Sequence, residues 1–207
     1  MHIEFLVEEP SAEAALRGLV PKILGPDVEF RVIRFQGKKD LLNLLPGRLK
    51  GYRGWIPADW RIVVMVDEDR QDCLELKAKL EKAAGDAGLV TKTRAAGGAG
   101  FQVLNRISIE ELEAWFFGDV EALHLAYPRI PRSLETKSKY RDPDAIQGGT
   151  WEALERELQG KGYFRGGLAK IEAAKAISAH MDPDQNRSKS FQVFRDGLRD
   201  MVNYPRT

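Results

Sequence analysis

The chain is poor in cysteine and has no long apolar run. Only Cys73 is a cysteine among its 207 residues, so an internal disulfide and a cysteine-based zinc site are both excluded. No stretch approaches the roughly 18 to 20 apolar residues that a membrane-spanning helix needs. The first residues, MHIEFLVEEPSAE, lack the basic start, apolar stretch and small-residue site of a signal peptide. We therefore expect a soluble, cytoplasmic protein with no membrane partner.

Several enzyme motifs are also missing. There is no Gly-x-x-x-x-Gly-Lys-Ser/Thr segment, so we expect no ATP motor within the chain, and there is no Gly-x-Ser-x-Gly elbow. The three histidines are scattered, which gives no support to a zinc hydrolase. With 32 basic and 31 acidic residues the net charge is +1. That balance argues against a protein that holds nucleic acid by bulk charge, and it leaves room for a local basic groove.

What the chain does contain is an alternation of strand and helix patterns in its first 120 residues. The segment RIVVMV (61–66) is, after Arg61, a continuous apolar and mostly β-branched run, typical of a strand buried on both faces of a parallel sheet. The alternation predicts an α/β fold with a mostly parallel, doubly wound sheet flanked by helices. The expected strands are 2–7, 28–35, 61–66, 89–93 and 101–107.

Helical spacing of apolar residues follows most of these strands. We expect Pro21 to kink or shorten the first helix and Pro46 to disturb the end of the second, with 47–60 as a connection. Beyond residue 120 the strand patterns fade and helices dominate. We therefore divide the chain into an α/β core (1–120) and a helical C-terminal extension (121–207). The expected helices are 12–23, 39–49, 73–83, 109–117, 151–158, 168–180 and 190–201.

Three aspartates follow the strongest predicted strand. Asp67 and Asp69 are two residues apart, so an extended backbone points both side chains the same way. Two neighbouring carboxylates repel unless a positive charge neutralises them, and Mg²⁺ or Mn²⁺ is the natural partner for such oxygen ligands. The simpler alternative is that Asp72 caps the next helix and that the other two are solvated loop acids.

Two further acidic groups stand at expected element ends. Glu8 and Glu9 close the first strand, and they meet the aspartates if the first and third strands are neighbours. The segment 110–113 carries three glutamates at the start of a helix, and Glu111 and Glu113 are candidates to support the site. Periodicity does not say which of these acids faces a crevice, and a solvated helix start remains equally open.

The segments LVEEPSAE, VDEDRQDC and EELEAWFFGD together resemble a bacterial Toprim-like family of unknown function. That family is related in its core to the Toprim domains of overcoming-lysogenization-defect (OLD) nucleases, topoisomerases and primases. The resemblance implies a Toprim-like, Rossmann-like sheet. In that alignment of motifs, Glu8 matches the glutamate after the first strand, Asp67 and Asp69 match the Asp-x-Asp, and Glu13 matches a second acid of the OLD-type nucleases. Lys170 and the stretch NRSKSF (186–191) match positions that recur in the family.

Two departures narrow what the resemblance implies. Glu9 stands where relatives carry a small glycine, which adds negative charge beside the site. The spacing of Asp72 differs from the Asp-x-Asp-x-Asp of topoisomerases. Strand passage also needs further domains and a tyrosine nucleophile, so we do not expect topoisomerase activity.

The chemistry implied by the resemblance is metal-assisted hydrolysis of phosphodiester bonds in DNA or RNA. Glu8 is then a metal ligand or the general base, and Asp67 and Asp69 are metal ligands for Mg²⁺ or Mn²⁺. Lys170 is expected as a catalytic residue, and either it or Arg106 would stabilise charge in the transition state. The plainer alternatives are a solvated helix lysine at 170 and, at 106, a structural ion-pair partner of the 110–113 acids.

Relatives of this kind often accompany AAA-type ATPases in phage-defence modules, which makes such an ATPase an expected partner beside nucleic acid. The alternative function is a non-catalytic interaction or regulatory module that partners the ATPase and keeps the acids as a structural metal site or docking patch. The sequence leaves the oligomeric state open, a homo-oligomer included.

Overall fold

A parallel sheet forms the centre of the protein. The computed structural model describes residues 1–68, 71–95, 100–109 and 111–203. Within this part of the chain, four parallel strands pair in the order β2-β1-β3-β4. The predicted α/β class with a parallel sheet is confirmed. The strands are β1 (His2–Val7), β2 (Glu29–Arg34), β3 (Trp60–Asp67) and β4 (Val103–Ser108).

All four strands run the same way, but the order in which the chain adds them to the sheet changes side once. From β1 the chain crosses to β2 on one side, then returns to form β3 on the other side of β1 and β4 beyond it. The carboxyl ends of β1 and β3 therefore flank the point at which the strand order reverses. In open parallel sheets, ligands bind in the crevice at this position.

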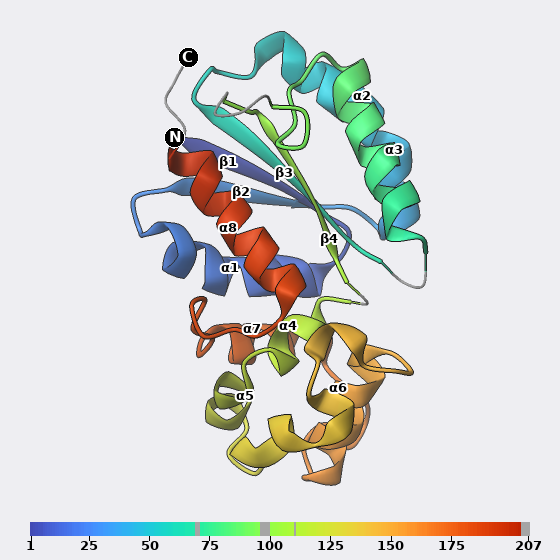
Figure 1. Cartoon of the computed structure of the whole chain (residues 1–207), viewed down its shortest axis with the longest axis vertical. Helices are drawn as coiled ribbons and strands as arrows, with labels where there is room; N and C mark the ends of the chain where they lie inside the picture. Colours follow the sequence, from blue (N-terminus) through green and yellow to red (C-terminus); the bar gives the residue numbers. More distant parts are fainter. Residues whose placement is uncertain (69–70, 96–99, 110, 204–207) are drawn as a thin grey trace.

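Helices cover both faces of the sheet (Figure 1). On one face α1 (Pro10–Leu24) and α8 (Lys189–Asn203) pack against Phe5 and Val63. On the other, α2 (Lys38–Trp55) and α3 (Cys73–Asp86) pack against Leu6 and Val64. Successive residues of a strand point to opposite faces, so each apolar run supplies both layers of core.

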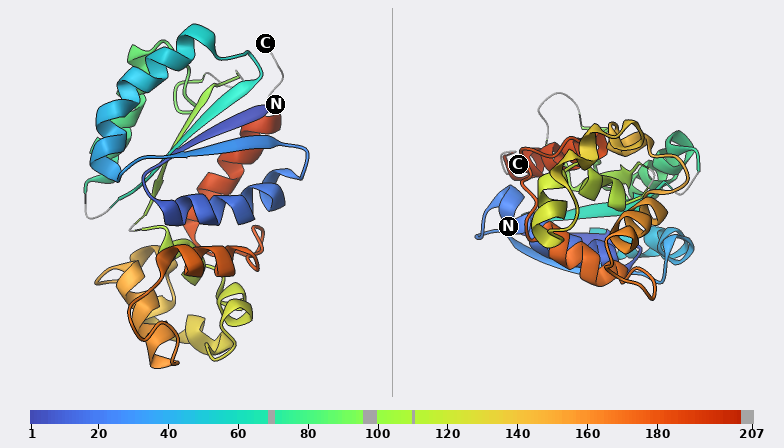
Figure 2. Two further views of the ribbon diagram at one scale, coloured as in Figure 1. Left: turned by 180° about the vertical axis from the view of Figure 1, so that it is seen from behind. Right: turned by 90° about the horizontal axis from the view of Figure 1, so that it is seen from below.

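A helical lobe lies beyond the carboxyl edge of the sheet, at the bottom of Figure 1 and the left view of Figure 2. It is joined to the core by the packing of α1 on α7. In the described residues, no helix has the length and apolar character needed to cross a bilayer. The lobe comprises α4 (Glu113–Phe117), α5 (Val120–Ala126), three short 3-10 turns (Arg132–Thr136, Ser138–Tyr140 and Pro143–Ala145), α6 (Thr150–Gly160) and α7 (Lys170–Ser178).

The last helix, α8, leaves the lobe and returns to the sheet, where it contacts β4 and α1. Its Phe194 ring stacks on Trp115 of α4 at 4.8 Å, and the Trp115 indole N–H donates to Ser190 Oγ at 2.9 Å. Gly197 lets α8 approach β4 closely, because a Cβ there would stand 3.0 Å from Leu104 Cδ2. One helix thus packs on both the sheet and the lobe.

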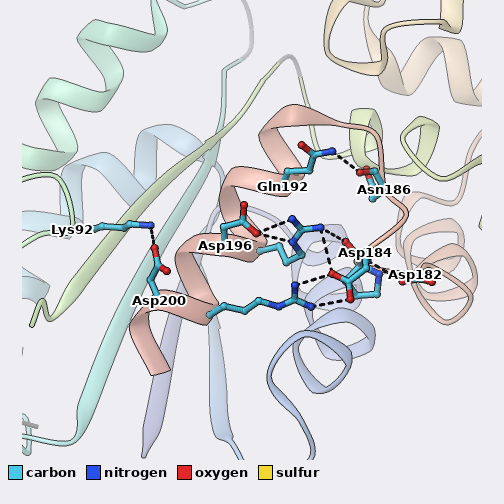
Figure 3. Close-up of polar contacts among 10 residues, drawn as sticks. Lys92, Asp182, Asp184, Asn186, Gln192, Asp196 and Asp200 are labelled. Carbon is cyan, nitrogen blue, oxygen red and sulfur yellow. Dashed lines mark hydrogen bonds and ion pairs between the residues drawn. The ribbon is translucent and has the colours of Figure 1, made fainter. Parts of the chain in front are cut away.

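Polar contacts hold the two ends of α8 in place (Figure 3). Near its start, Gln192 Nε2 donates to the carbonyl of Asn186 at 2.9 Å. Arg199, in the second half of the helix, pairs at 2.7 Å with Asp184, which precedes α8 in the chain. Near its end, Lys92 Nζ lies 2.5 Å from Asp200 Oδ2. Surface pairs of this kind contribute little each, so they orient the helix more than they stabilise it.

Three expected elements differ from the structure. α2 continues through Pro46 to Trp55, because Pro46 is exposed while Leu45 and Tyr52 are buried on the opposite stripe. The expected strand at 89–93 is absent from the described sheet. There only Thr91 bridges Val103, and a turn begins at Thr91, whose carbonyl accepts from the N–H groups of residues 94 and 95. The helix expected at 109–117 is confined to α4.

The packing of α8 on the core yields a stability prediction. Phe194→Ala should lower the free energy of unfolding by about 3 to 5 kcal/mol, because it removes a fully buried ring from between α4 and the sheet. The matched control is Val193→Ala on the same helix, where the side chain is 42% exposed and the change should stay within about 0.5 kcal/mol. Urea denaturation measures both. Equal effects of the two substitutions would mean that α8 does not belong to the cooperative core.

Candidate functional site

Two acidic residues meet at the reversal point of the sheet. Glu8 directly follows β1, and Asp67 is the last residue of β3. Glu8 Oε1 accepts a hydrogen bond from the backbone N–H of Asp67 at 2.5 Å. Both residues are buried, with 7% and 8% of their surface exposed. The adjacency of β1 and β3 therefore brings together the two acids that the sequence placed after separate strands. Asp69, the third expected ligand, lies outside the described residues.

The connection from β2 to α2 makes hydrogen bonds to the residues that follow β1 and β3. The N–H of Gly37 donates to the carbonyl of Glu8 at 2.9 Å, and Gly37 adopts φ +96°, a conformation that favours glycine. The next residue, Lys38, donates through Nζ to the carbonyl of Glu68 at 3.1 Å. Sequence reasoning missed Lys38, since its place beside β3 follows from the strand order and not from any local pattern.

The helical lobe contributes a buried acid and a lysine. Glu113, in α4, is 2% exposed, and its Oε2 has no hydrogen-bond partner among the described atoms. Lys170, the first residue of α7, places Nζ 4.0 Å from Glu113 Oε1 and 4.9 Å from the ring centre of Trp151. The interpretation of Lys170 as a simple solvated lysine does not fit these contacts.

Burial and neighbouring charges shift the pKa values of this pair in the same direction. Burial raises the pKa of Glu113 to about 7, and the positive charge of Lys170 only partly opposes it. Burial alone would lower the pKa of Lys170, but the charges of Glu113, Glu9, Glu111 and Asp67 raise it overall. Lys170 therefore carries a positive charge near neutral pH, where Glu113 exchanges its proton. Because the charge of Asp67 at the end of β3 acts on Lys170, this lysine lies close to the carboxyl edge of the sheet.

Glu111 and Glu9 have structural contacts of their own. Glu111 Oε2 accepts from the N–H and hydroxyl of Thr150 and from the N–H of Trp151, at 2.9 to 3.0 Å, and so satisfies the start of α6. Glu9 stands at the N-cap of α1 and accepts from the hydroxyl of Ser11 at 2.6 Å. Their carboxylates add negative charge around Lys170.

Two other candidate acids lie in different surroundings. Glu13 pairs with Arg17 on α1 at 2.7 Å and lies 3.9 Å from Arg34 of β2. Asp72 caps α3 by accepting from the N–H groups of Leu74 and of residue 75. The helix-cap alternative for Asp72 is therefore what the structure shows.

Arg106, in β4, lies on the face of the sheet that α8 covers. Its guanidinium packs against Gly197 of α8, and the acids whose charges act on it are Glu81 and Asp200. In the described residues it forms no ion pair with Glu111 or Glu113. Position 110, the remaining acid of that segment, lies outside the described residues, so the roles considered for Arg106 stay predictions.

The stretch 186–191 has a structural role. Asn186 donates to the carbonyl of Trp115 at 2.8 Å, and Asp144 accepts from the Ser188 hydroxyl at 2.7 Å and from the N–H of Lys189 at 2.5 Å. These bonds tie the start of α8 to the lobe. The stretch 186–191 thus lies at a junction of the fold.

The donor set at the reversal point suits a hard cation. Carboxylate oxygens are the ligands that Mg²⁺ and Mn²⁺ prefer, and Glu8 and Asp67 are held side by side by backbone bonds. Among residues 1–68, 71–95, 100–109 and 111–203, no three Asp, Glu, His or Cys side chains are already gathered as a metal cluster. A complete ligand set would thus require Asp69 as well.

Comparison with known proteins identifies a family but no activity. Neither a curated protein nor a solved structure matches the chain. The family described as "Domain of unknown function (DUF4276)" matches residues 7–199, which include both strand ends of the site, α4 and Lys170. Because this match covers nearly the whole sequence, the chain belongs to the DUF4276 family.

Proposed function

We propose that the protein is a metal-dependent phosphodiesterase that hydrolyses nucleic acid. The observation that carries the proposal is the contact of Glu8 with the backbone of Asp67 at the carboxyl edge of adjacent parallel strands. This edge is where open α/β sheets bind ligands. We choose nucleic acid as the substrate because the segments LVEEPSAE, VDEDRQDC and EELEAWFFGD resemble motifs of Toprim domains, including those of OLD-type nucleases.

Glu8, Asp67 and Asp69 are the residues that would hold Mg²⁺ or Mn²⁺. A divalent cation at this place supplies charge neutralisation for a phosphate oxygen and lowers the pKa of a bound water. Glu8 is fixed by two backbone bonds, its Oε1 to Asp67 and its own carbonyl to Gly37. A ligand that is held in this way needs little reorganisation when it binds a cation.

Lys170 would bind the phosphate, and Glu113 would transfer a proton. Lys170 keeps its positive charge in a partly buried position, so its ammonium group is suited to bind a phosphate oxygen as negative charge develops. Glu113 has a pKa of about 7, which suits a general acid or base at neutral pH. Its unpartnered Oε2 is the atom that would give or take the proton.

The site residues predict a loss of cleavage without a loss of folding. Asp67→Asn should lower metal-dependent cleavage at least about 100-fold, because it removes a negatively charged ligand while the backbone N–H that binds Glu8 remains. The assay compares plasmid DNA, single-stranded DNA and RNA with Mg²⁺ or Mn²⁺. Asp27→Asn, an exposed aspartate before β2, is the matched control and should cleave like the wild type.

Thermal melts of the same proteins separate this function from the alternative. A melting temperature that rises with Mg²⁺ in the wild type but not in Asp67→Asn, without any cleavage, would indicate a non-catalytic metal-binding module, such as one that serves an AAA-type ATPase. Full cleavage by folded Asp67→Asn would contradict the proposed site.

The raised pKa of Glu113 predicts a pH-dependent stability. The folded protein binds this proton more tightly than the unfolded chain, whose glutamate has an ordinary pKa near 4.5. The stabilisation is full below that ordinary value and is lost as the pH rises through about 7. Glu113→Gln stays neutral, so at pH 8 it should be more stable than the wild type by up to about 3 kcal/mol, with little difference at pH 4.5.

Urea denaturation in EDTA over this pH range measures the effect. Glu29→Gln, an exposed glutamate of β2, serves as the control and should change stability equally at both pH values. A difference between Glu113→Gln and the wild type that does not vary with pH would show that Glu113 titrates normally.

A further inference from the structure

A second cluster of chemically useful side chains lies at the amino ends of the strands, on the face covered by α2. Three strands and the second half of α2 line an open pocket of about 300 Å³ there. We call it the amino-edge pocket, and its lining includes Glu4, Arg31, Arg48, Tyr52, Trp55 and Trp60. None of these residues takes part in the site at the carboxyl edge.

Aromatic rings form one wall of the amino-edge pocket. Trp55 and Trp60 meet edge to face at 5.6 Å, and Tyr52 lies 5.5 Å from Trp55. Trp55 is 60% exposed, so much of its ring surface faces water and contributes little to folding. Exposed aromatic surface beside a cavity is typical of a ligand-binding site.

A buried carboxylate forms the floor. Glu4, in the middle of β1, is 3% exposed, and its two oxygens accept from the Tyr52 hydroxyl at 2.8 Å and lie 2.9 Å from His2 Nε2. A carboxylate has about four acceptor positions, so these two contacts leave room for two more donors. His2 in turn stacks on Trp60 at 4.0 Å, which joins the floor to the aromatic wall.

Two arginines complete the pocket. Arg31 stands directly opposite Glu4 in the β1–β2 register, and in the described chain its guanidinium has no ion pair. Arg48 lies over the Tyr52 ring at 5.6 Å. With one carboxylate and two guanidinium groups the pocket carries a net positive charge, which disfavours a cationic ligand. Guanidinium groups are the preferred partners of phosphate.

We propose that the amino-edge pocket binds a nucleoside phosphate, with guanine preferred as the base. The planar base stacks on the exposed face of Trp55. The remaining acceptor positions of Glu4 match the adjacent N1–H and N2–H donors of guanine, a pair that adenine lacks. Arg31 and Arg48 bind the phosphate. The ligand is a free nucleotide or the 5′ end of a nucleic-acid chain, since both present the same base and phosphate.

This inference is independent of the proposed phosphodiesterase activity. The pocket lies at the opposite ends of the strands from Glu8 and Asp67. Binding is therefore measured in EDTA, where metal-dependent cleavage cannot occur, and Asp67→Asn should bind with wild-type affinity. Failure of cleavage and failure of nucleotide binding are thus seen in separate experiments.

Isothermal titration calorimetry with GMP, AMP, CMP and guanosine tests the proposal. GMP should bind more tightly than AMP or CMP, and Trp55→Ala should weaken GMP binding at least about fivefold. Arg31→Ala should weaken GMP but not guanosine, because only GMP carries the phosphate. Leu44→Ala, which alters another exposed residue of α2, is the matched control and should leave binding unchanged. Glu4→Gln, if folded by circular dichroism, should remove the preference for guanine.

A 5′-phosphorylated oligonucleotide beginning with guanine distinguishes the two sources. Tight binding of GMP indicates a free nucleotide, whereas binding of the oligonucleotide at much lower concentration than GMP indicates a chain end. The proposal is overturned if neither ligand binds at millimolar concentration, or if Trp55→Ala and Arg31→Ala both bind like the wild type.

Discussion

Parallel pairing of β1 with β2 on one side and β3 on the other is the constraint on which the candidate site depends. This arrangement brings the ends of three strands to one edge, so the carbonyl of Glu8 can bind Gly37 while its carboxylate binds the backbone of Asp67. The same order places Lys38 beside Glu68. The main-chain bond between Gly37 and Glu8 does not depend on any side chain, whereas the bond between Asp67 and Glu8 needs the Glu8 carboxylate but not the Asp67 side chain.

The helical lobe contributes a second group of residues to the site, in which burial and charge, not main-chain hydrogen bonds, set the properties of the side chains. Glu113 sits in a buried position with an unsatisfied oxygen, which is unfavourable for a carboxylate and raises its pKa to about 7. Lys170 offsets part of this cost. A buried carboxylate of this kind is tolerated when the surrounding packing fixes its position. Here that packing comes from the stacking of Trp115 on Phe194 and from the helix caps at Glu111 and Asp144. Unfavourable burial of this kind is concentrated at functional sites.

The two edges of the sheet carry opposite chemistry. The carboxyl edge gathers acids with two lysines, Lys38 and Lys170, which suits a divalent cation and a phosphodiester. The amino edge gathers aromatic rings, two arginines and one buried carboxylate, which suits a base with its phosphate. Because β1 supplies both Glu4 and Glu8, one strand connects the two places. A nucleotide held at one edge and a chain cleaved at the other would share the same rigid sheet.

The sequence by itself determined the α/β class and the positions of Glu8 and Asp67 at strand ends, because apolar runs such as RIVVMV and the acids after them are local patterns. It also indicated the cap at Asp72. Only the tertiary structure decided that α8 returns to the sheet, that Glu113 lies buried beside Lys170, and that Glu4 and Trp60 face one cavity. Periodicity states which side of a helix or strand is buried. It does not state which distant segment covers that side, and the burial that shifts a pKa or shapes a pocket depends on that segment.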